Sequence, residues 1–140
     1  MGSSRRPDEL TSASRLTELW RVKEVTRQAV AAFGLGSREC FDVVLAVHEA
    51  VVNAITHGNG SDPRRKVALR FSYAADCLTV HVRDEGRGFD VQQALARLSV
   101  PPNLDEPSGR GMLLSTRLMD EVQFNDTGNE VRLTKYRRSS

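Results

Sequence analysis

The sequence lacks the features that mark disulfide-bonded, membrane-spanning and strongly charged proteins. Its two cysteines, Cys40 and Cys77, lie far apart and form no CxxC spacing, so they predict buried thiols in a reducing cytoplasm, with no disulfide and no metal site. No apolar run approaches the ~18 residues that a membrane span needs. The formal net charge of +2 is too small to indicate nucleic acid binding by itself. These absences predict a single cytoplasmic domain that has no membrane partner and binds no nucleic acid directly.

Several common active-site motifs are absent as well. The glycine-rich Walker motif that ends in Gly-Lys-Ser/Thr does not occur, which excludes a Walker-type nucleotide site. The GxSxG motif of hydrolases does not occur either. His48 and Glu49 begin an HExxH pattern, but Val52 stands where the second histidine is needed, so no zinc pair forms. Any chemistry must therefore come from a less common combination of residues.

The apolar pattern predicts two long helices and two β-hairpins, with short helices between the hairpins. The expected elements are, in chain order, helices at 14–33 and 37–57, a hairpin at 67–82, helices at 91–98 and 112–119, and a hairpin at 122–136. Residues 1–8 are expected to form a disordered lead, and residues 9–138 one folded domain. This order predicts an α+β fold in which helices cover one face of a mixed, mostly antiparallel sheet.

The second predicted helix carries polar residues along one face. Asp42, Glu49, Asn53 and His57, with the small Ala46 between them, recur at steps of three or four residues. The buried side is expected to consist of the apolar residues Phe41, Val44, Leu45, Val52 and Ile55. A solvent-exposed face with i,i+4 pairs is one interpretation, but residues 41–57 include no Lys or Arg. Carboxylate and amide groups without a countercharge instead suit a hard cation and phosphate oxygens.

A first glycine loop, residues 84–89, follows the second strand of the first predicted hairpin. Asp84 then lies at a strand end, where its carboxylate can accept a hydrogen bond from an exocyclic amine such as that of adenine. Gly86 and Gly88 have no side chains, so they let the backbone approach a flat base closely. The loop alone is a weak signal, because two glycines most often mark a turn.

A second glycine loop, Ser108-Gly109-Arg110-Gly111, opens directly into a predicted helix. The free backbone N–H groups and the helix dipole form an anion site there, and Arg110 adds positive charge. The loop differs from the dinucleotide-binding fingerprint because Leu114 occupies the third glycine position and no strand precedes it. The two loops and the polar helix face together predict a metal site, a purine acceptor and a phosphate cradle.

In this order the segments resemble the GHKL superfamily of ATP-binding domains, which includes gyrase, heat-shock ATPases, histidine kinases and mismatch-repair ATPases. "EAVVNAITHGNG" resembles its N box, "DEGRGFD" its first glycine box and "SGRGMLLSTRLMDEV" its second. Within the superfamily, the sequence is most similar to the small anti-sigma-factor serine/threonine kinases of the RsbW type. The likeness covers about residues 10–136.

The resemblance implies the Bergerat ATP-binding fold, a two-layer sandwich that binds ATP and Mg²⁺. In that fold Asn53 ligates Mg²⁺, Asp84 holds the adenine amine, and Glu49 acts as the general base. The remaining cofactor-binding residues implied are Gly86, Gly88, Ser108, Gly109, Arg110, Gly111 and Met112. The family often has an arginine just before the lid glycines and a Gly-Thr pair in the last hairpin. This sequence has "DEPS" and Gly128-Asn129 at those places, which puts Asn129 where the adenine-holding threonine is expected.

The function implied by the resemblance is phosphorylation of a STAS-type anti-anti-sigma partner, together with capture of an RNA polymerase sigma factor, by a homodimer. A non-catalytic ATP-binding module that only captures partners is the alternative, because binding and transfer use nearly the same residues. A detached histidine kinase domain is disfavoured, since the first predicted helix offers no acceptor histidine. His57 and Asn59 either contact phosphate or cap the end of the second helix.

Overall fold

The computed structural model describes residues 9–86 and 114–137. Its elements are β1 (Glu9–Ala13), a 3₁₀ turn (Leu16–Glu18), α1 (Leu19–Phe33), α2 (Ser37–Asn53), a π-helical turn (Ala54–Gly58), β2 (Lys66–Tyr73), β3 (Cys77–Arg83), β4 (Glu121–Phe124) and β5 (Glu130–Tyr136). Residues 114–118 are also helical. The helix predicted at 91–98 lies outside the described residues.

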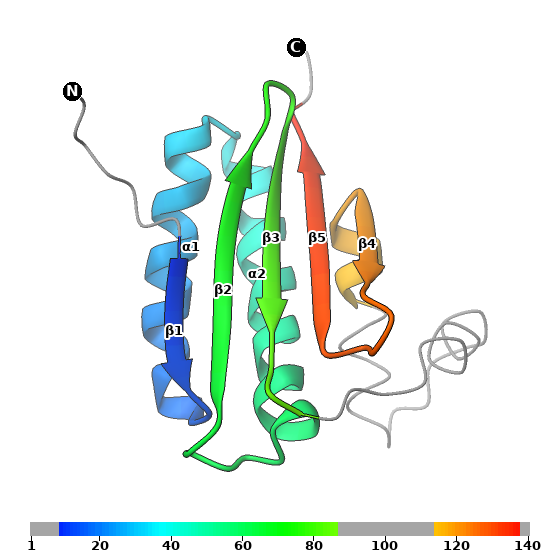
Figure 1. The fold of residues 1–140 in the computed structure, drawn as a ribbon. Coiled ribbons are helices and arrows are strands. Elements are labelled where there is room, and N and C mark those ends of the chain that lie inside the picture. Colours follow the sequence, from blue (N-terminus) through cyan, green and yellow to red (C-terminus); the bar gives the residue numbers. More distant parts are fainter. Residues whose placement is uncertain (1–8, 87–113, 138–140) are drawn as a thin grey trace, which may run out of the picture.

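The strands form a single sheet in the order β1-β2-β3-β5-β4. Both α1 and α2 pack on the same face of this sheet (Figure 1). All pairings between the described strands are antiparallel, so this part of the sheet shows none of the predicted mixed character. The predicted α+β fold, with helices in one layer and the sheet in the other, is confirmed.

The two hairpins form where the alternating pattern predicts them. Leu69 pairs with Val82 and Phe71 pairs with Val80 across β2 and β3, and all four side chains are buried against the helices. Full burial of side chains of this size stabilises a fold by about 1.5–3 kcal/mol each. Because successive strand residues point to opposite faces, this burial fixes the register of the sheet.

The buried side of the second helix differs from the prediction except at Ile55, which is 1% exposed. The buried residues of α2 are Val43, Ala46, Val47, Ala50 and Val51, whereas the side chain predicted to lead the stripe, Phe41, is 66% exposed. Leu45 is half-buried. The prediction favoured large side chains, but the helix packs through its alanines and valines because small residues allow close approach to neighbouring elements. Ala46 is thus covered by the chain itself, with its carbonyl accepting a hydrogen bond from the Ser115 hydroxyl at 3.2 Å.

One helical segment among the described residues, Ser37–Gly58, is long and apolar enough to cross a membrane by length and composition. In the fold this segment includes α2, and three of its valines and both of its alanines pack in the core: Val43, Ala46, Val47, Ala50 and Val51. A core helix of a soluble protein passes the same test, so the segment gives only weak support for a membrane span.

The sequence pattern does not predict β1. The strand has one large apolar residue, Leu10, and its other inward position is Ser12, which is 2% exposed. Leu10 pairs with Leu69 and Ser12 with Val67 at the edge of the sheet. Since a small serine replaces the second apolar residue, the alternation is invisible in the sequence, and the helix expected from residue 14 begins at Leu19.

Candidate functional site

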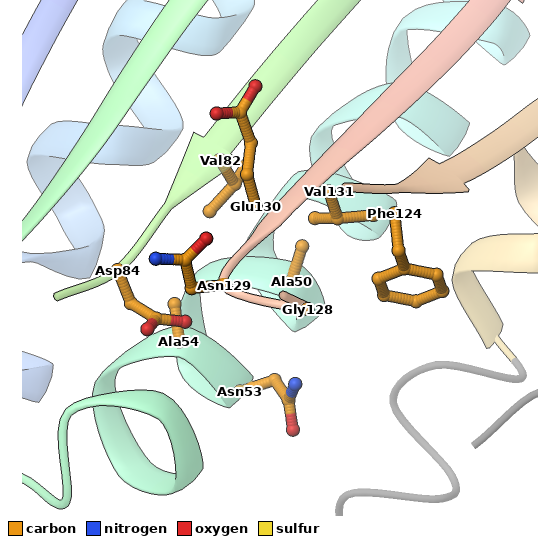
Figure 2. Close-up of a pocket in the computed structure, with 10 residues that line it drawn as sticks. All are labelled: Ala50, Asn53, Ala54, Val82, Asp84, Phe124, Gly128, Asn129, Glu130 and Val131. Atoms are coloured by element: carbon orange, nitrogen blue, oxygen red, sulfur yellow. The ribbon is translucent and has the colours of Figure 1, made fainter. Parts of the chain in front are cut away.

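A pocket lies at one end of the sheet, between the end of α2, the end of β3 and the β4–β5 turn (Figure 2). Its lining residues are Ala50, Asn53, Ala54, Val82, Asp84, Phe124, Gly128, Asn129, Glu130 and Val131. The space measures about 290 Å³, including a part that is open to solvent. Apolar side chains supply most of the wall and a few polar groups stand among them, which is the usual composition of a small-ligand site.

Asp84 is held in this pocket by the backbone on both sides. Its N–H donates to the carbonyl oxygen of Asn129 at 2.9 Å, which extends the pairing of β3 with β5 by one residue. The N–H of Gly86 donates to Asp84 Oδ1 at 2.8 Å. Among the described residues, no hydrogen bond is made to Asp84 Oδ2, so this oxygen is available to a donor on a ligand.

Two glycines make room for the Asp84 carboxylate. A Cβ atom at Gly58 would overlap with this carboxylate, and a Cβ atom at Gly86 would overlap with the carbonyl oxygen of Gly58. Neither glycine has a positive φ angle, so the requirement is close approach and not an unusual backbone conformation. The turn that ends α2 and the loop that follows β3 therefore interlock at Asp84.

Burial in the pocket raises the pKa of Asp84 above its usual value of 3.8. The hydrogen bond from Gly86 and the positive charge of Arg65 oppose this shift but do not cancel it. A carboxylate that is partly desolvated gains more from a hydrogen-bond donor than one in water does. The electrostatics thus favour a ligand that brings a donor to Asp84.

Asn53 and Glu49 occupy successive turns of α2. Asn53 is the last residue of the α-helix and lines the pocket, while Glu49 is half-buried one turn earlier and is not part of the pocket wall. The helix widens into a π-helical turn directly after Asn53, a feature that is frequent at functional sites. The structure therefore brings Asn53, Asp84 and Asn129 to one pocket and leaves Glu49 beside it.

The premise that the polar face of α2 lacks a countercharge is wrong for its first member. Asp42 Oδ2 lies 3.6 Å from Nζ of Lys135, a residue of β5 whose side chain is largely buried. The same Nζ donates to the carbonyl oxygen of Leu118 at 2.6 Å. The countercharge comes from a distant strand, which a search along the helix sequence could not reveal. Asp42 thus has a structural partner, and the candidate ligand face begins at Glu49.

The side chain of Asn129 is engaged within its own turn. Its Oδ1 accepts hydrogen bonds from Asn125 Nδ2 at 2.6 Å and from Thr127 Oγ1 at 2.9 Å. Its backbone carbonyl receives the N–H of Asp84. Asn129 therefore supports Asp84 through its main chain, and its side-chain oxygen accepts hydrogen bonds within the β4–β5 turn.

Gly88 and the phosphate-cradle residues 108–112 lie outside the described residues.

Asn59 has one of the two roles expected for it. Its backbone N–H donates to the Ala54 carbonyl at 2.8 Å and so caps the helical end, whereas the residue is 2% exposed and its side chain does not reach a ligand. Its Nδ2 donates to Ser14 Oγ at 2.8 Å and to the Lys66 carbonyl at 2.9 Å, while its Oδ1 accepts from the Glu85 N–H at 2.8 Å. His57, in contrast, is exposed. Sequence reasoning missed this internal link because its partners lie in three separate segments.

Comparisons with known proteins agree with this geometry. The family described as the histidine kinase-like ATPase domain matches residues 12–135. A serine-protein kinase RsbW from Bacillus subtilis (strain 168) is 39% identical over 122 residues, which are 82% of this chain and 76% of that protein. An anti-sigma F factor from Thermoanaerobacter sp. (strain X514) is 32% identical over 118 residues, which are 79% of this chain and 82% of that protein.

A crystal structure of the RsbU and RsbW domains of a Mycobacterium tuberculosis protein matches 93% of this chain with a TM-score of 0.63. Sequence identity to it is 19%, and the match covers 31% of that longer chain, so it supports the fold alone. The sequence relatives and the family match confirm the predicted resemblance. The chain therefore belongs to the histidine kinase-like ATPase superfamily and, within it, to the RsbW-type family of anti-sigma-factor serine/threonine kinases.

Proposed function

We propose that this chain phosphorylates a serine or threonine of a STAS-type anti-anti-sigma partner with ATP, and that it regulates a sigma factor by partner switching. The observation that carries the proposal is that Asn53 from α2 and Asp84 from the end of β3 line one pocket. The kinase and anti-sigma names of the relatives support the reaction and the pathway. The homodimeric state and the cytoplasmic location stay predictions.

The pocket suits an adenine base. The side chains of Val82, Ala50 and Val131 provide an apolar wall for a flat ring, and Asp84 Oδ2 is available to accept a hydrogen bond. Adenine presents an exocyclic amine at its edge, which is the donor that a partly desolvated carboxylate favours. The base would therefore insert between the end of α2 and the β4–β5 turn, with its amine toward Asp84.

The same helix offers oxygen donors for Mg²⁺. Mg²⁺ usually binds one or two protein groups together with phosphate oxygens and water, and the described residues contain no cluster of three His, Cys, Asp or Glu. The amide oxygen of Asn53, at the pocket, fits such a sparse donor set. When bound, the ion would neutralise charge on the ATP phosphates. Asn53 is the residue that we assign to hold it.

Glu49 is the proposed general base. It lies one helical turn, about 6 Å of rise, before Asn53 on α2. In the reaction, its carboxylate takes the proton from the hydroxyl of the partner's serine or threonine. The hydroxyl oxygen bonds to the γ-phosphorus, and the bond from this phosphorus to the β–γ bridging oxygen breaks to release ADP. Phosphoryl transfer depends mainly on positioning of the reactants and neutralisation of charge, and the base contributes further by taking the proton.

Gly58→Ala is expected to weaken ATP binding, because the added Cβ displaces the Asp84 carboxylate from its place. Crowding of this kind also lowers the free energy of unfolding by about 1–3 kcal/mol. Gly60→Ala is the matched control: Gly60 has a φ of +60° and no atom near its Cβ position, so this change adds about 1–2 kcal/mol of backbone strain without touching Asp84. Calorimetric titration should show lower ATP affinity in Gly58→Ala alone, and equal losses in both variants would contradict the interlock.

The function itself is tested by a pull-down from a cell extract with Mg-ADP and Mg-ATP, followed by mapping of phosphorylated residues on the captured protein. We expect a STAS-type protein to be captured and to carry phosphoserine or phosphothreonine only when ATP is supplied. Capture of such a protein without any phosphorylation in ATP would favour the alternative, a non-catalytic module that uses ATP only to control binding.

A further inference from the structure

Asn59 joins segments that are remote in the sequence but adjacent in the fold. Ser14 follows β1, Lys66 begins β2, and Glu85 lies in the loop after β3. The Asn59 amide makes hydrogen bonds to all of these residues at 2.8–2.9 Å. The Ser14 hydroxyl in turn donates to the carbonyl of Arg65 at 2.9 Å, so the link from β1 continues into the residue before β2.

The link reaches the loop that carries Asp84. The N–H of Asp84 is held by Asn129 on one side, and the next N–H, that of Glu85, is held by Asn59 on the other. Glu85 also accepts a hydrogen bond from the Lys66 N–H through Oε1 at 2.8 Å. Two consecutive peptide groups are thus anchored to different elements, and this fixes the direction in which the Asp84 side chain leaves the backbone.

An amide is the side chain that this position requires. Asn59 uses one oxygen as an acceptor and its NH₂ group as a donor in two hydrogen bonds, and the residue itself is 2% exposed. An aspartate has no donor for the Lys66 carbonyl, and an alanine leaves the Glu85 N–H and this carbonyl without their side-chain partner. The Ser14 hydroxyl would keep the Arg65 carbonyl as its acceptor but lose the donor that Asn59 supplies. The loop would then shift to reach water, and Asp84 would move with it.

We propose that Asn59 is a positioning residue for base recognition, which acts by holding Asp84 in register with the adenine amine. The inference rests on the proposed function, in which Asp84 accepts that amine. Loss of Asn59 then weakens the discrimination between a purine that has the exocyclic amine and one that lacks it. A merely structural role would lower the folded fraction and leave this discrimination intact, because the phosphate contacts and the apolar wall treat both purines alike.

The test compares the affinity of the folded protein for ATP with its affinity for purine riboside triphosphate, which lacks only the exocyclic amine. In Asn59→Ala, the preference for ATP is expected to fall by about three- to tenfold. Thr26→Val is the control, because Thr26 is fully buried in α1, donates to the Val22 carbonyl at 2.8 Å and does not line the pocket. It should lower the melting temperature and keep the wild-type preference.

An unchanged preference in folded Asn59→Ala would overturn the inference, provided that Asp84→Asn loses the preference. If Asp84→Asn itself keeps the preference, the proposed base site is wrong, and the two failures are thereby distinguished. Should Asn59→Ala fail to fold, Ser14→Ala takes its place, since it removes one of the hydrogen-bond partners of Asn59 at a distance from the pocket. A reduced preference in Ser14→Ala supports the inference, and the wild-type preference contradicts it.

Discussion

Glu49→Gln is expected to slow phosphoryl transfer to the partner protein by about 10²–10⁴-fold, the usual contribution of a general base. Glutamine keeps the size and polarity of the side chain on α2 but cannot take the proton of the attacking hydroxyl. The affinity for ATP should change little, because Glu49 is not part of the pocket wall. Single-turnover phosphorylation, measured with saturating Mg-ATP, separates this loss of rate from any loss of binding.

Glu24→Gln provides the matched control for loss of one negative charge. Glu24 is an exposed residue of α1 that pairs with Arg27 at 3.1 Å, and an exposed pair contributes little to stability. This variant should transfer phosphate at the wild-type rate. A Glu49→Gln protein that transfers phosphate as fast as Glu24→Gln would show that another group accepts the proton, or that no base is needed.

Asp84→Asn is expected to weaken ATP binding by about 10- to 100-fold, since hydrogen bonds to a charged group contribute about 1.5–3 kcal/mol. The carboxylate uses Oδ1 for the Gly86 N–H and has Oδ2 for the base. An asparagine must turn its NH₂ group toward one of these two donors, so one hydrogen bond is replaced by repulsion. Purine riboside triphosphate, which lacks the amine, should bind nearly equally to both proteins in the same titration.

The pH dependence of ATP binding provides a second measure of Asp84. Burial raises the pKa of this carboxyl, so it takes up a proton at a higher pH than an exposed aspartate does. ATP affinity should therefore fall as the pH is lowered through this raised pKa, and the fall should be absent in Asp84→Asn. Equal pH profiles for the two proteins would contradict the assignment of Asp84.

The contribution of Asp84 to folding stability has the opposite sign. A pKa that is higher in the folded than in the unfolded chain means that ionisation of this group disfavours folding. The destabilisation is fully present above the raised pKa of the folded state and disappears as the pH falls toward the usual value. Thermal unfolding of the ligand-free protein should show this small gain on mild acidification in the wild type relative to Asp84→Asn.

The hairpins were predictable from the sequence because their signal is local. Val67, Leu69 and Phe71 alternate with exposed residues, and each is buried. The edge strand β1 was not predictable, since it uses Ser12 where the pattern needs an apolar residue. The prediction of the buried side of α2 was wrong at most positions, because it ranked side chains by size. Helix packing also depends on which side chains allow close approach, as Ala46 and Ala50 do.

The site was also predictable only in part, because some of its residues stand in recognisable local segments and others depend on distant contacts. Asn53 and Asp84 stand in segments whose order resembles that of a known family, and the structure places both at one pocket. Gly58 and Asn59 were not assigned their roles, because these depend on contacts with residues about 26–45 positions away in the chain. In the sequence, a glycine that makes room for a carboxylate cannot be distinguished from any other glycine that ends a helix. The difference appears only when the loop after β3 packs against it.

The central claim is that the end of α2 and the loop after β3 bind one molecule of Mg-ATP. A crystal structure of the complex tests it most directly. We expect the adenine amine to donate to Asp84 and the Asn53 amide oxygen to ligate Mg²⁺ within the pocket of Figure 2. A nucleotide bound elsewhere, or Asn53 and Asp84 in contact with different molecules, would contradict the account.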